Sequence, residues 1–302
     1  MYNEERKRQF LAEKSENAII SKNLEITFEA TAEREERLGR DICEWTSQEI
    51  ISYYKYLSTP YVQSLIQLHN GLSNYATWCM INGLIRNNQN HYLEIKTETL
   101  LKCTDVNKLV YTAIKREDLL DEIKLLQNES DKFIILGLFE GIPITDDVMK
   151  NVKVSDLNGN TLRLSNGMCL DISPELVHYL YMADEEDGYQ AFGKREIIIP
   201  YQPEDTVIKH TINNKAGSNS TVVIGARFRR CIKFLEMPEG TTIKTIRESG
   251  RLDLMKKISD KYNVGMEDTI TTPHLRELHE KIYGKIQNQM TYLNTWGKCF
   301  DK

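Results

Sequence analysis

The chain has 302 residues, of which 40% are hydrophobic and 27% are charged, as in a globular protein with room for two domains. Its formal net charge of −5 argues against a protein that binds polyanions over its whole surface. The sequence has no apolar run of about 18 residues. Its charged first residues also lack the apolar core of a signal peptide, so we expect a cytoplasmic protein with no membrane segment.

Several kinds of site are not supported by the residue pattern. No P-loop, dinucleotide-binding glycine motif or nucleophile-elbow motif occurs, so no cofactor is predicted. His274 and His279 do not have the i, i+4 spacing of two zinc ligands on one helical face, so no metal site is predicted. The six cysteines contain no C-x-x-C pair, and we expect reduced, mostly buried thiols.

The first part of the chain is predicted to be helical. Residues 2–15 are rich in helix formers. Residues 24–28 form a short apolar segment, and Thr31 has the chemistry to cap a separate helix that ends near Gly39. Two distinct segments are therefore expected between the opening helix and that glycine.

The next two helices have clearer signals. Thr46 and Glu49 have the spacing of a capping box, which begins a helix. Residues 61–83 carry apolar side chains at helical spacing and end at a glycine. These patterns predict an all-helical domain over residues 1–103.

Residues 104–302 mix helices with a few strands. An apolar helix over 131–141 ends at a glycine, and an Asn-Gly turn predicts a hairpin within 161–172. Residues 197–200 have the pattern of a strand. The fold class predicted for the whole chain is mainly α with a small β-sheet (α+β).

Positive charge is concentrated in one region of this acidic chain. Between Thr206 and Ile258, eleven Lys or Arg residues outnumber four Asp or Glu residues, a local charge of +7 that leaves −12 for the remainder. We expect a helix over 222–236 and another over 242–250, which Gly250 ends before a third begins. The charge distribution favours a confined phosphate-binding surface, and a basic but merely solvated helix face is the alternative.

The stretch 243–250, Ile-Lys-Thr-Ile-Arg-Glu-Ser-Gly, resembles the His-x-x-Arg box of tyrosine recombinases, the phage integrase family. In that family the box reads Ile-Thr-x-His-x-Leu-Arg, followed by a small residue. Arg247 occupies the arginine position and Lys244 the histidine position. An arginine can hold a phosphate through its planar fork of donors, whereas a lysine is a poor proton shuttle at neutral pH. The resemblance therefore implies a DNA-backbone contact that is retained while the chemistry is lost.

Three passages of the first part resemble the core-binding domain of the same family in their order and spacing. They are the opening helix over 2–11, the segment 41–51, and residues 75–84, which match the passage Tyr-x-x-Trp-Cys-x-x-x-Gly-Leu. The resemblance implies an N-terminal helical SAM-like core-binding domain over 1–103. It also implies a C-terminal recombinase catalytic-like domain over 104–302.

Catalytic groups of the family are missing at the matching positions. The passage that ends the 131–141 helix resembles "Leu-Leu-Tyr-x-Gly-Leu-Arg-x-x-Glu", and Pro143 stands where the first catalytic arginine belongs. The family hairpin carries a proton-donating lysine, but residues 154–193 contain none. Tyr283 is the best-placed candidate nucleophile and Tyr292 the second. Because so little of the catalytic set remains, we predict no catalytic residue and no enzyme activity.

These features predict a double-stranded DNA-binding protein with an integrase-like fold and no recombinase activity. It is similar to the repressors of SPbeta-type temperate phages, which implies transcriptional control of lysogeny from operator-like sites. We expect it in the cytoplasm of a bacterial host cell, associated with the nucleoid. Self-association and a small regulatory protein partner stay open, and no membrane is expected as a partner. The predicted DNA contacts, mostly to phosphate, are Arg227, Arg229, Arg230, Lys244, Arg247 and Arg251.

Two other functions fit the same residues. The first is an active recombinase with an atypical site that uses Tyr283 or Tyr292 as nucleophile. The second is an interaction module whose basic face docks an acidic protein.

Overall fold

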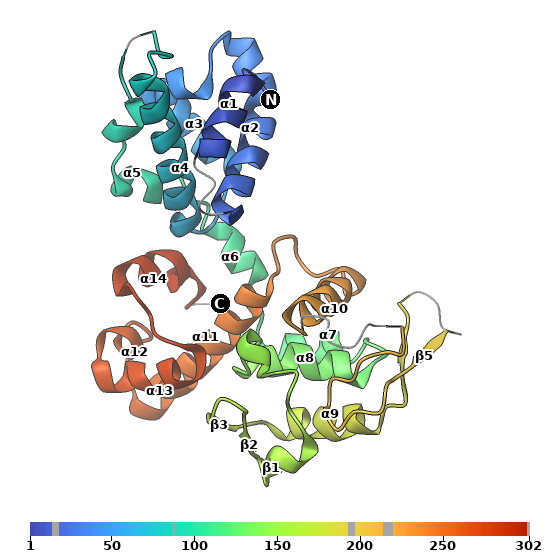
Figure 1. Cartoon of the computed structure of the whole chain (residues 1–302). Helices are drawn as coiled ribbons and strands as arrows, with labels where there is room; N and C mark the ends of the chain where they lie inside the picture. The colour runs from blue at the N-terminus through green and yellow to red at the C-terminus, as the bar shows by residue number, and fades with distance from the viewer. Residues whose placement is uncertain (14–17, 87, 193–196, 214–219, 301–302) are drawn as a thin grey trace. The chain divides into compact units, whose positions relative to one another are not determined.

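The computed structural model of the chain describes residues 1–13, 18–86, 88–192, 197–213 and 220–300 (Figure 1). The chain divides into two compact units, Met1–Asn107 and Lys108–Lys302, and each has its own hydrophobic core. Helices make up most of both units, and the strands form two small sheets of the second unit. This confirms the predicted fold class, mainly α with small β-sheets in two domains. The units divide after Asn107, near the predicted boundary after residue 103.

The N-terminal unit is helical throughout its described length. Its helices are α1 (Glu4–Glu13), α2 (Ala18–Leu38), α3 (Ser47–Leu57), α4 (Val62–Ile81) and α5 (Thr97–Leu101), with 3₁₀ turns η1 (Ile42–Glu44) and η2 (His91–Glu94). The capping box is present, because Thr46 accepts from the Glu49 N–H and the Glu49 carboxylate accepts from the Thr46 N–H. Gly83, at a φ of +65°, follows α4 as predicted.

Helix α2 corrects one expectation. Thr31 does not cap a new helix but lies inside α2, where its hydroxyl hydrogen-bonds to the Thr27 carbonyl and to Glu35, each at 3.0 Å. Leu24, Phe28, Thr31 and Glu35 recur every three or four residues and are all buried. These four residues therefore form the buried face of one helix. Thr31 and Glu35 are polar, so the apolar residues alone did not show the helical period.

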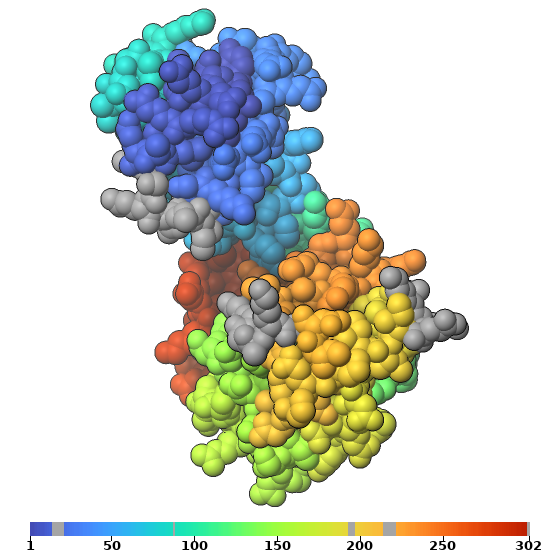
Figure 2. Space-filling view, turned by 45° about the vertical axis from the view of Figure 1, so that its right-hand side comes forward, coloured from blue at the N-terminus to red at the C-terminus, as the bar shows by residue number. Residues whose placement is uncertain are grey.

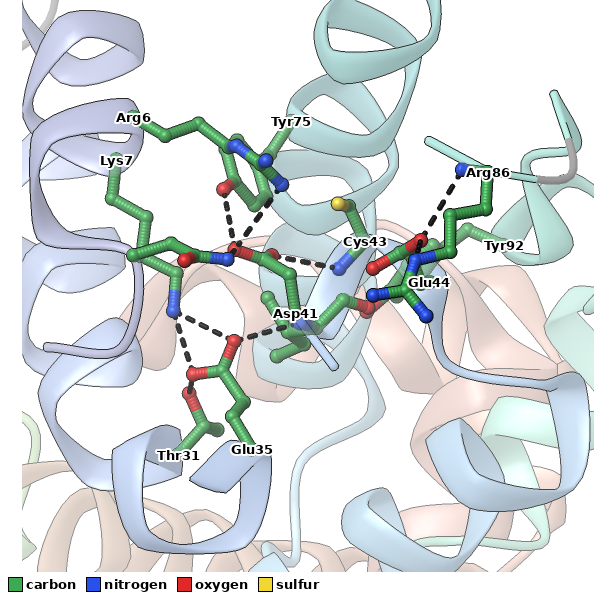
Figure 3. A network of polar contacts seen from close by, with 12 residues as sticks. Arg6, Lys7, Thr31, Glu35, Asp41, Cys43, Glu44, Tyr75, Arg86 and Tyr92 are labelled. Atoms are coloured by element: carbon green, nitrogen blue, oxygen red, sulfur yellow. Dashed lines mark hydrogen bonds and ion pairs between the residues drawn. The ribbon is translucent and has the colours of Figure 1, made fainter. Parts of the chain in front are cut away.

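A buried ion pair joins α1 to α2 (Figure 3). The Lys7 ammonium donates to the two Glu35 oxygens at 2.8 and 2.6 Å, and both side chains are fully buried. Glu35 also accepts from the Ile42 N–H at 2.7 Å, while the neighbouring buried Asp41 accepts from the Tyr75 hydroxyl at 3.1 Å. Burial raises the pKa of Glu35, and the Lys7 charge opposes that rise. The first helix of the unit is thus held by a satisfied polar network as well as by apolar packing.

The C-terminal unit mixes helices and short strands. Its helices are α6 (Asn107–Thr112), which begins at the boundary, α7 (Arg116–Ile123), α8 (Glu129–Phe139), α9 (Pro174–Glu185), α10 (Ser220–Phe234), α11 (Ile243–Tyr262), α12 (Asp268–Thr271), α13 (Pro273–Tyr283) and α14 (Gln289–Trp296). Its 3₁₀ turns are η3 (Thr145–Asp147), η4 (Val154–Asp156) and η5 (Gly297–Cys299), and its strands are β1 (Leu157–Asn158), β2 (Thr161–Arg163), β3 (Cys169–Asp171), β4 (Gly188–Gln190) and β5 (Ile198–Pro200).

Helix α8 forms the centre of this unit. Almost all of its side chains are buried, and it contacts α7, α9, α10 and α11. The predicted hairpin is present, with β2 antiparallel to β3 and Leu162 opposite Leu170, and β1 adds a third strand. Gly167, at a φ of +85°, lies in the hairpin turn. A second pair of antiparallel strands, β4 and β5, lies near α9 and α10 (Figure 1).

Gly250 does not end a helix as expected, because α11 runs unbroken from Ile243 to Tyr262. A Cβ atom at this position would lie 1.7 Å from the Phe139 carbonyl oxygen and 2.7 Å from the Tyr283 hydroxyl. The glycine therefore allows α11 to approach the C-terminal end of α8, a contact that local propensity cannot reveal.

Two general expectations can be compared with the described residues. None of the helices within those ranges is long and apolar enough to cross a membrane. All six cysteines are free thiols, of which Cys169 is exposed and the others are buried, as predicted.

Candidate nucleic-acid interface

Helix α11 begins at the stretch that resembles the recombinase box. Thr242 is the N-cap, and its hydroxyl accepts from the Thr245 N–H at 3.2 Å. Lys244 follows in the first turn with an exposed side chain, and partial desolvation lowers the pKa of its amine. A helix N-terminus with a lysine in its first turn attracts anions. The structure therefore places Lys244 where a phosphate can reach it.

Arg247 lies one turn further along α11 and is half-buried. Its Nη1 atom donates to the carbonyl oxygens of Gly141 and Ile142 at 3.2 and 2.7 Å. Those carbonyls immediately precede Pro143, which the sequence resemblance aligns with the first arginine of the recombinases. Burial lowers the pKa of Arg247, and the reference value for arginine is high enough that the group stays charged. The retained arginine therefore binds the main chain that leads into Pro143.

Tyr283 packs in the same place. Its ring centroid lies 5.8 Å from the Arg247 guanidinium, and its hydroxyl donates to the Phe139 carbonyl at the end of α8. Gly141, at a φ of +102°, has no room for a side chain, because a Cβ would lie 2.2 Å from Ile282. Burial raises the pKa of Tyr283 above its ordinary value. The candidate nucleophile is thus close to Arg247 but is held as a hydrogen-bond donor to the backbone.

Arg251 lies one further turn along α11 and is buried, with 4% of its surface exposed. Its Nη2 atom donates to the carbonyls of Tyr283 and Gly284 at 2.6 and 3.0 Å, at the C-terminal end of α13. The Arg251 guanidinium also lies 5.7 Å from the ring of Tyr283 and 5.6 Å from that of Tyr292. The prediction that Arg251 contacts DNA does not fit this position, because its donors are turned into the protein.

Arg227 is also buried, again with 4% of its surface exposed, so the predicted direct DNA contact does not fit it either. Its Nε atom donates to Asp131 at 2.7 Å and its Nη2 atom to Ser130 at 2.5 Å. The guanidinium lies 4.8 Å from the Tyr189 ring. The ion pair between Arg227 on α10 and Asp131 on α8 therefore fixes α10 against the N-terminal end of α8.

The other two predicted contacts of α10 face solvent. Arg229 and Arg230 are exposed, as is Lys233 on the same helix, and the Arg230 guanidinium lies 5.6 Å from the ring of Tyr189. Figure 2 shows α10 (orange) on the surface of the C-terminal unit, beside the yellow segment that precedes it. Lys215, another basic residue of this region, lies outside the described residues. The exposed candidates of the predicted set are therefore Arg229, Arg230 and Lys244.

Other residues that organise this site were not identified from the sequence. The Phe139 carbonyl has no recognisable signal in one sequence, and Gly250 was predicted only as a helix end, because the importance of both arises from a contact between distant segments. Arg116 is a similar case: its Nη2 atom contacts Glu140 at 3.3 Å and Glu175 at 2.9 Å. It thereby ties the residue after α8 to the start of α9. Among the described residues, no group of histidine, cysteine or acidic side chains has the arrangement of a metal site.

Comparison with known proteins agrees with this architecture. The family model described as "MrpR, N-terminal core-binding domain" matches residues 1–81. The model described as "MrpR, C-terminal catalytic domain" matches residues 113–294. A search of curated proteins found no match. The two matches follow the two compact units in order, and so the chain belongs to the MrpR family, with the core-binding and catalytic-type domains of the integrase-like tyrosine recombinase architecture.

Proposed function

We propose that this protein binds double-stranded DNA without cutting it and acts as a transcriptional repressor of the temperate-phage type. The observation that carries the proposal is the arrangement at the end of α8. Arg247 and Tyr283 both donate hydrogen bonds to main-chain carbonyls there, to Ile142 and to Phe139. In place of a cationic pocket open to a scissile phosphate, this region is a packed junction between helices.

Strand cleavage requires chemistry that this junction opposes. A tyrosine nucleophile must lose its proton, but burial raises the pKa of Tyr283 and its hydroxyl already donates to a carbonyl. A proline at position 143 supplies no charge to a developing phosphorane. Losing one preorganised electrostatic donor typically lowers kcat by about 10²–10³-fold. The loss of the first arginine and of the hairpin lysine would compound that effect.

DNA binding requires only exposed cations that can contact phosphate, and no nucleophile or proton donor. Arg229, Arg230 and Lys244 are exposed, and Arg247 is half-buried with hydrogen bonds from Nη1 alone among the described residues. Contacts from such cations to phosphate give affinity and salt dependence without chemistry. A protein that occupies DNA in this way can block transcription wherever its site overlaps a promoter.

The test begins with the binding sequence. Sites are selected from a pool of random duplexes, and affinity for the selected duplex and for a scrambled one is measured by fluorescence anisotropy across a salt titration. We expect specific binding and a linear fall of log affinity with log salt. In vitro transcription from a promoter overlapping the selected site should then be inhibited. Absence of any duplex binding would refute the proposal and favour a module that docks an acidic protein.

An active recombinase is the second candidate, and one observation favours it. The Tyr283 ring lies within 5.8 Å of the Arg247 guanidinium, so the two groups are neighbours even though the tyrosine is engaged elsewhere. A nicked suicide duplex containing the selected site separates the two functions. A covalent protein–DNA adduct that disappears in Tyr283→Phe would establish the enzyme, and an intact duplex would support the repressor.

A further inference from the structure

A pocket in the C-terminal unit lies away from the junction of Arg247 and Tyr283. It has a volume of about 270 Å³ and is bounded by the segment around Ala113, by one side of α11 and by Cys299 and Phe300. This volume is close to the lower end of small-molecule sites in proteins, roughly 300 Å³, so the space suits only a small ligand. All of its lining residues belong to one compact unit.

One face of α11 forms the longest wall of this pocket. Ser249, Leu252, Lys256 and Asp260 recur at intervals of three or four residues, with Asp253 beside Leu252, and all line the space. Arg247 and Arg251 lie on the other side of the helix, because they are offset from Ser249 by two residues, or about half a turn. The pocket therefore shares α11 with the candidate DNA site but uses none of its side chains.

The floor of the pocket is apolar. Ala113, Ile114, Leu252, Met266 and Phe300 contribute to it. Ser249 supports the wall, since its hydroxyl accepts from the Ile114 N–H at 3.1 Å and donates to the Thr245 carbonyl at 2.8 Å. The segment before α7 is thus tied directly to α11, and the apolar floor is held between them.

The rim of the pocket carries charges of both signs. Lys257 is paired with Asp253 at 2.7 Å, and this ion pair is internal to the wall. Lys115, Glu117, Lys256 and Asp260 also line the pocket, and none of them has a side-chain ion pair with another described residue. The two cations and two carboxylates can bind the two opposite charges of one small molecule. The apolar side chains of that molecule would then be buried against the apolar floor.

We propose that this pocket binds a small zwitterionic ligand with apolar side chains, of about the size of a dipeptide. The ligand carboxylate contacts Lys115 or Lys256, its ammonium group contacts Glu117 or Asp260, and its apolar side chains cover Leu252 and Met266. This site is separate from the predicted DNA contacts, and ligand binding there does not require the protein to repress transcription.

The test uses the full chain without DNA and the dipeptide Leu-Leu as the probe. Isothermal titration calorimetry should show saturable binding at millimolar concentration or below. N-acetyl-Leu-Leu and Leu-Leu amide each lack one of the two charges, and we expect each to bind at least about tenfold more weakly, because a charged rim group loses its partner. Equal affinity for the capped and uncapped dipeptides would overturn the assignment.

Three variants locate the site. Met266→Trp fills the pocket from a partly exposed position, and Lys256→Met combined with Asp260→Asn removes one charge of each sign from the rim. Both should weaken binding of Leu-Leu by about tenfold or more. Lys261→Met, at an exposed position of the same helix outside the pocket, should leave it unchanged. Absence of saturable Leu-Leu binding, or the same affinity in all three variants, would refute the proposal, and circular dichroism checks that each variant is folded.

Discussion

Arg247 donates a 2.7 Å hydrogen bond to the Ile142 carbonyl, one residue before Pro143, which the sequence resemblance aligns with the first catalytic arginine of the recombinases. Arg247, which the same resemblance aligns with the arginine of the recombinase box, is thus directed to the backbone that leads into Pro143. With Arg251, which binds the carbonyls of Tyr283 and Gly284, it makes α11 the element that joins the ends of α8 and α13. Two consecutive turns of one helix therefore hold the junction together.

Arg247→Ala should affect both stability and DNA binding. It leaves the Ile142 and Gly141 carbonyls without a partner, which typically costs about 1–3 kcal/mol of unfolding free energy. Urea denaturation measures that loss. The remaining donors of Arg247 are expected to contact phosphate, so affinity for specific and random duplex should fall alike, with a salt slope smaller by about one contact. Unchanged affinity for both duplexes would remove Arg247 from the interface.

Arg229→Ala combined with Arg230→Ala should weaken binding to every duplex. Both side chains are exposed on α10, so we expect little change in stability and a salt slope smaller by about two contacts. Lys124→Ala is the matched control, because Lys124 is an exposed cation of the same unit outside the basic region. Anisotropy titrations that show equal losses in the control and the double variant would contradict an interface on α10.

Tyr283→Phe separates a structural tyrosine from a nucleophile. The variant loses the hydrogen bond to the Phe139 carbonyl, which should lower the unfolding free energy by about 0.5–1.5 kcal/mol. DNA affinity should stay the same, since the hydroxyl is not available to phosphate. The suicide-duplex assay and an anisotropy titration, run on the wild type and on this variant, check both statements.

Gly250→Ala should be severely destabilising. The added methyl carbon would lie 1.7 Å from the Phe139 carbonyl oxygen, so α8 and α11 would have to separate, at a cost of about 3 kcal/mol or more. Gly225→Ala is the matched control within α10. A Cβ there meets only the end of the Arg229 side chain, at 3.7 Å, and removing a mid-helix glycine stabilises by roughly 0.5–1 kcal/mol. Thermal denaturation should shift in opposite directions for the two variants.

Lys7→Met should destabilise the N-terminal unit in a pH-dependent way. It leaves the buried Glu35 carboxylate without its cation, which typically costs about 3–5 kcal/mol. Burial already raises the pKa of Glu35, and loss of the Lys7 charge raises it further. The folded state then binds a proton that the unfolded state has released, so stability falls as pH rises from the ordinary glutamate pKa to the raised one.

The pH profile of that variant is the measurement. Urea denaturation of Lys7→Met should show a loss that is smallest at acidic pH and largest at neutral pH. Lys7→Met combined with Glu35→Gln removes the titrating group and should flatten this dependence. If Lys7→Met lowers the unfolding free energy by the same amount at every pH, the loss does not come from an unpaired Glu35 carboxylate.

Local chemistry was enough for much of the fold. The Thr46–Glu49 capping box, the glycine after α4 and the Asn166–Gly167 turn act within a few residues, and each produced the element that it predicts. The order of the recombinase-like passages also indicated two domains of an integrase-like fold, which the family matches show. The predictions of helix boundaries that proved wrong involved Thr31 and Gly250. Both lie inside a helix. The Thr31 hydroxyl hydrogen-bonds within α2, and the missing side chain of Gly250 lets α11 approach α8.

The orientation of the basic residues depended on tertiary structure. Arg227 and Arg229 are two residues apart on α10, but the first is buried on Asp131, 96 positions away, while the second faces solvent. The sequence by itself determined the charge excess and the helices that carry it, and its resemblance to the recombinases predicts that catalytic groups are missing. Only tertiary structure decided which cations remain exposed, because an ion pair between distant segments depends on how those segments pack.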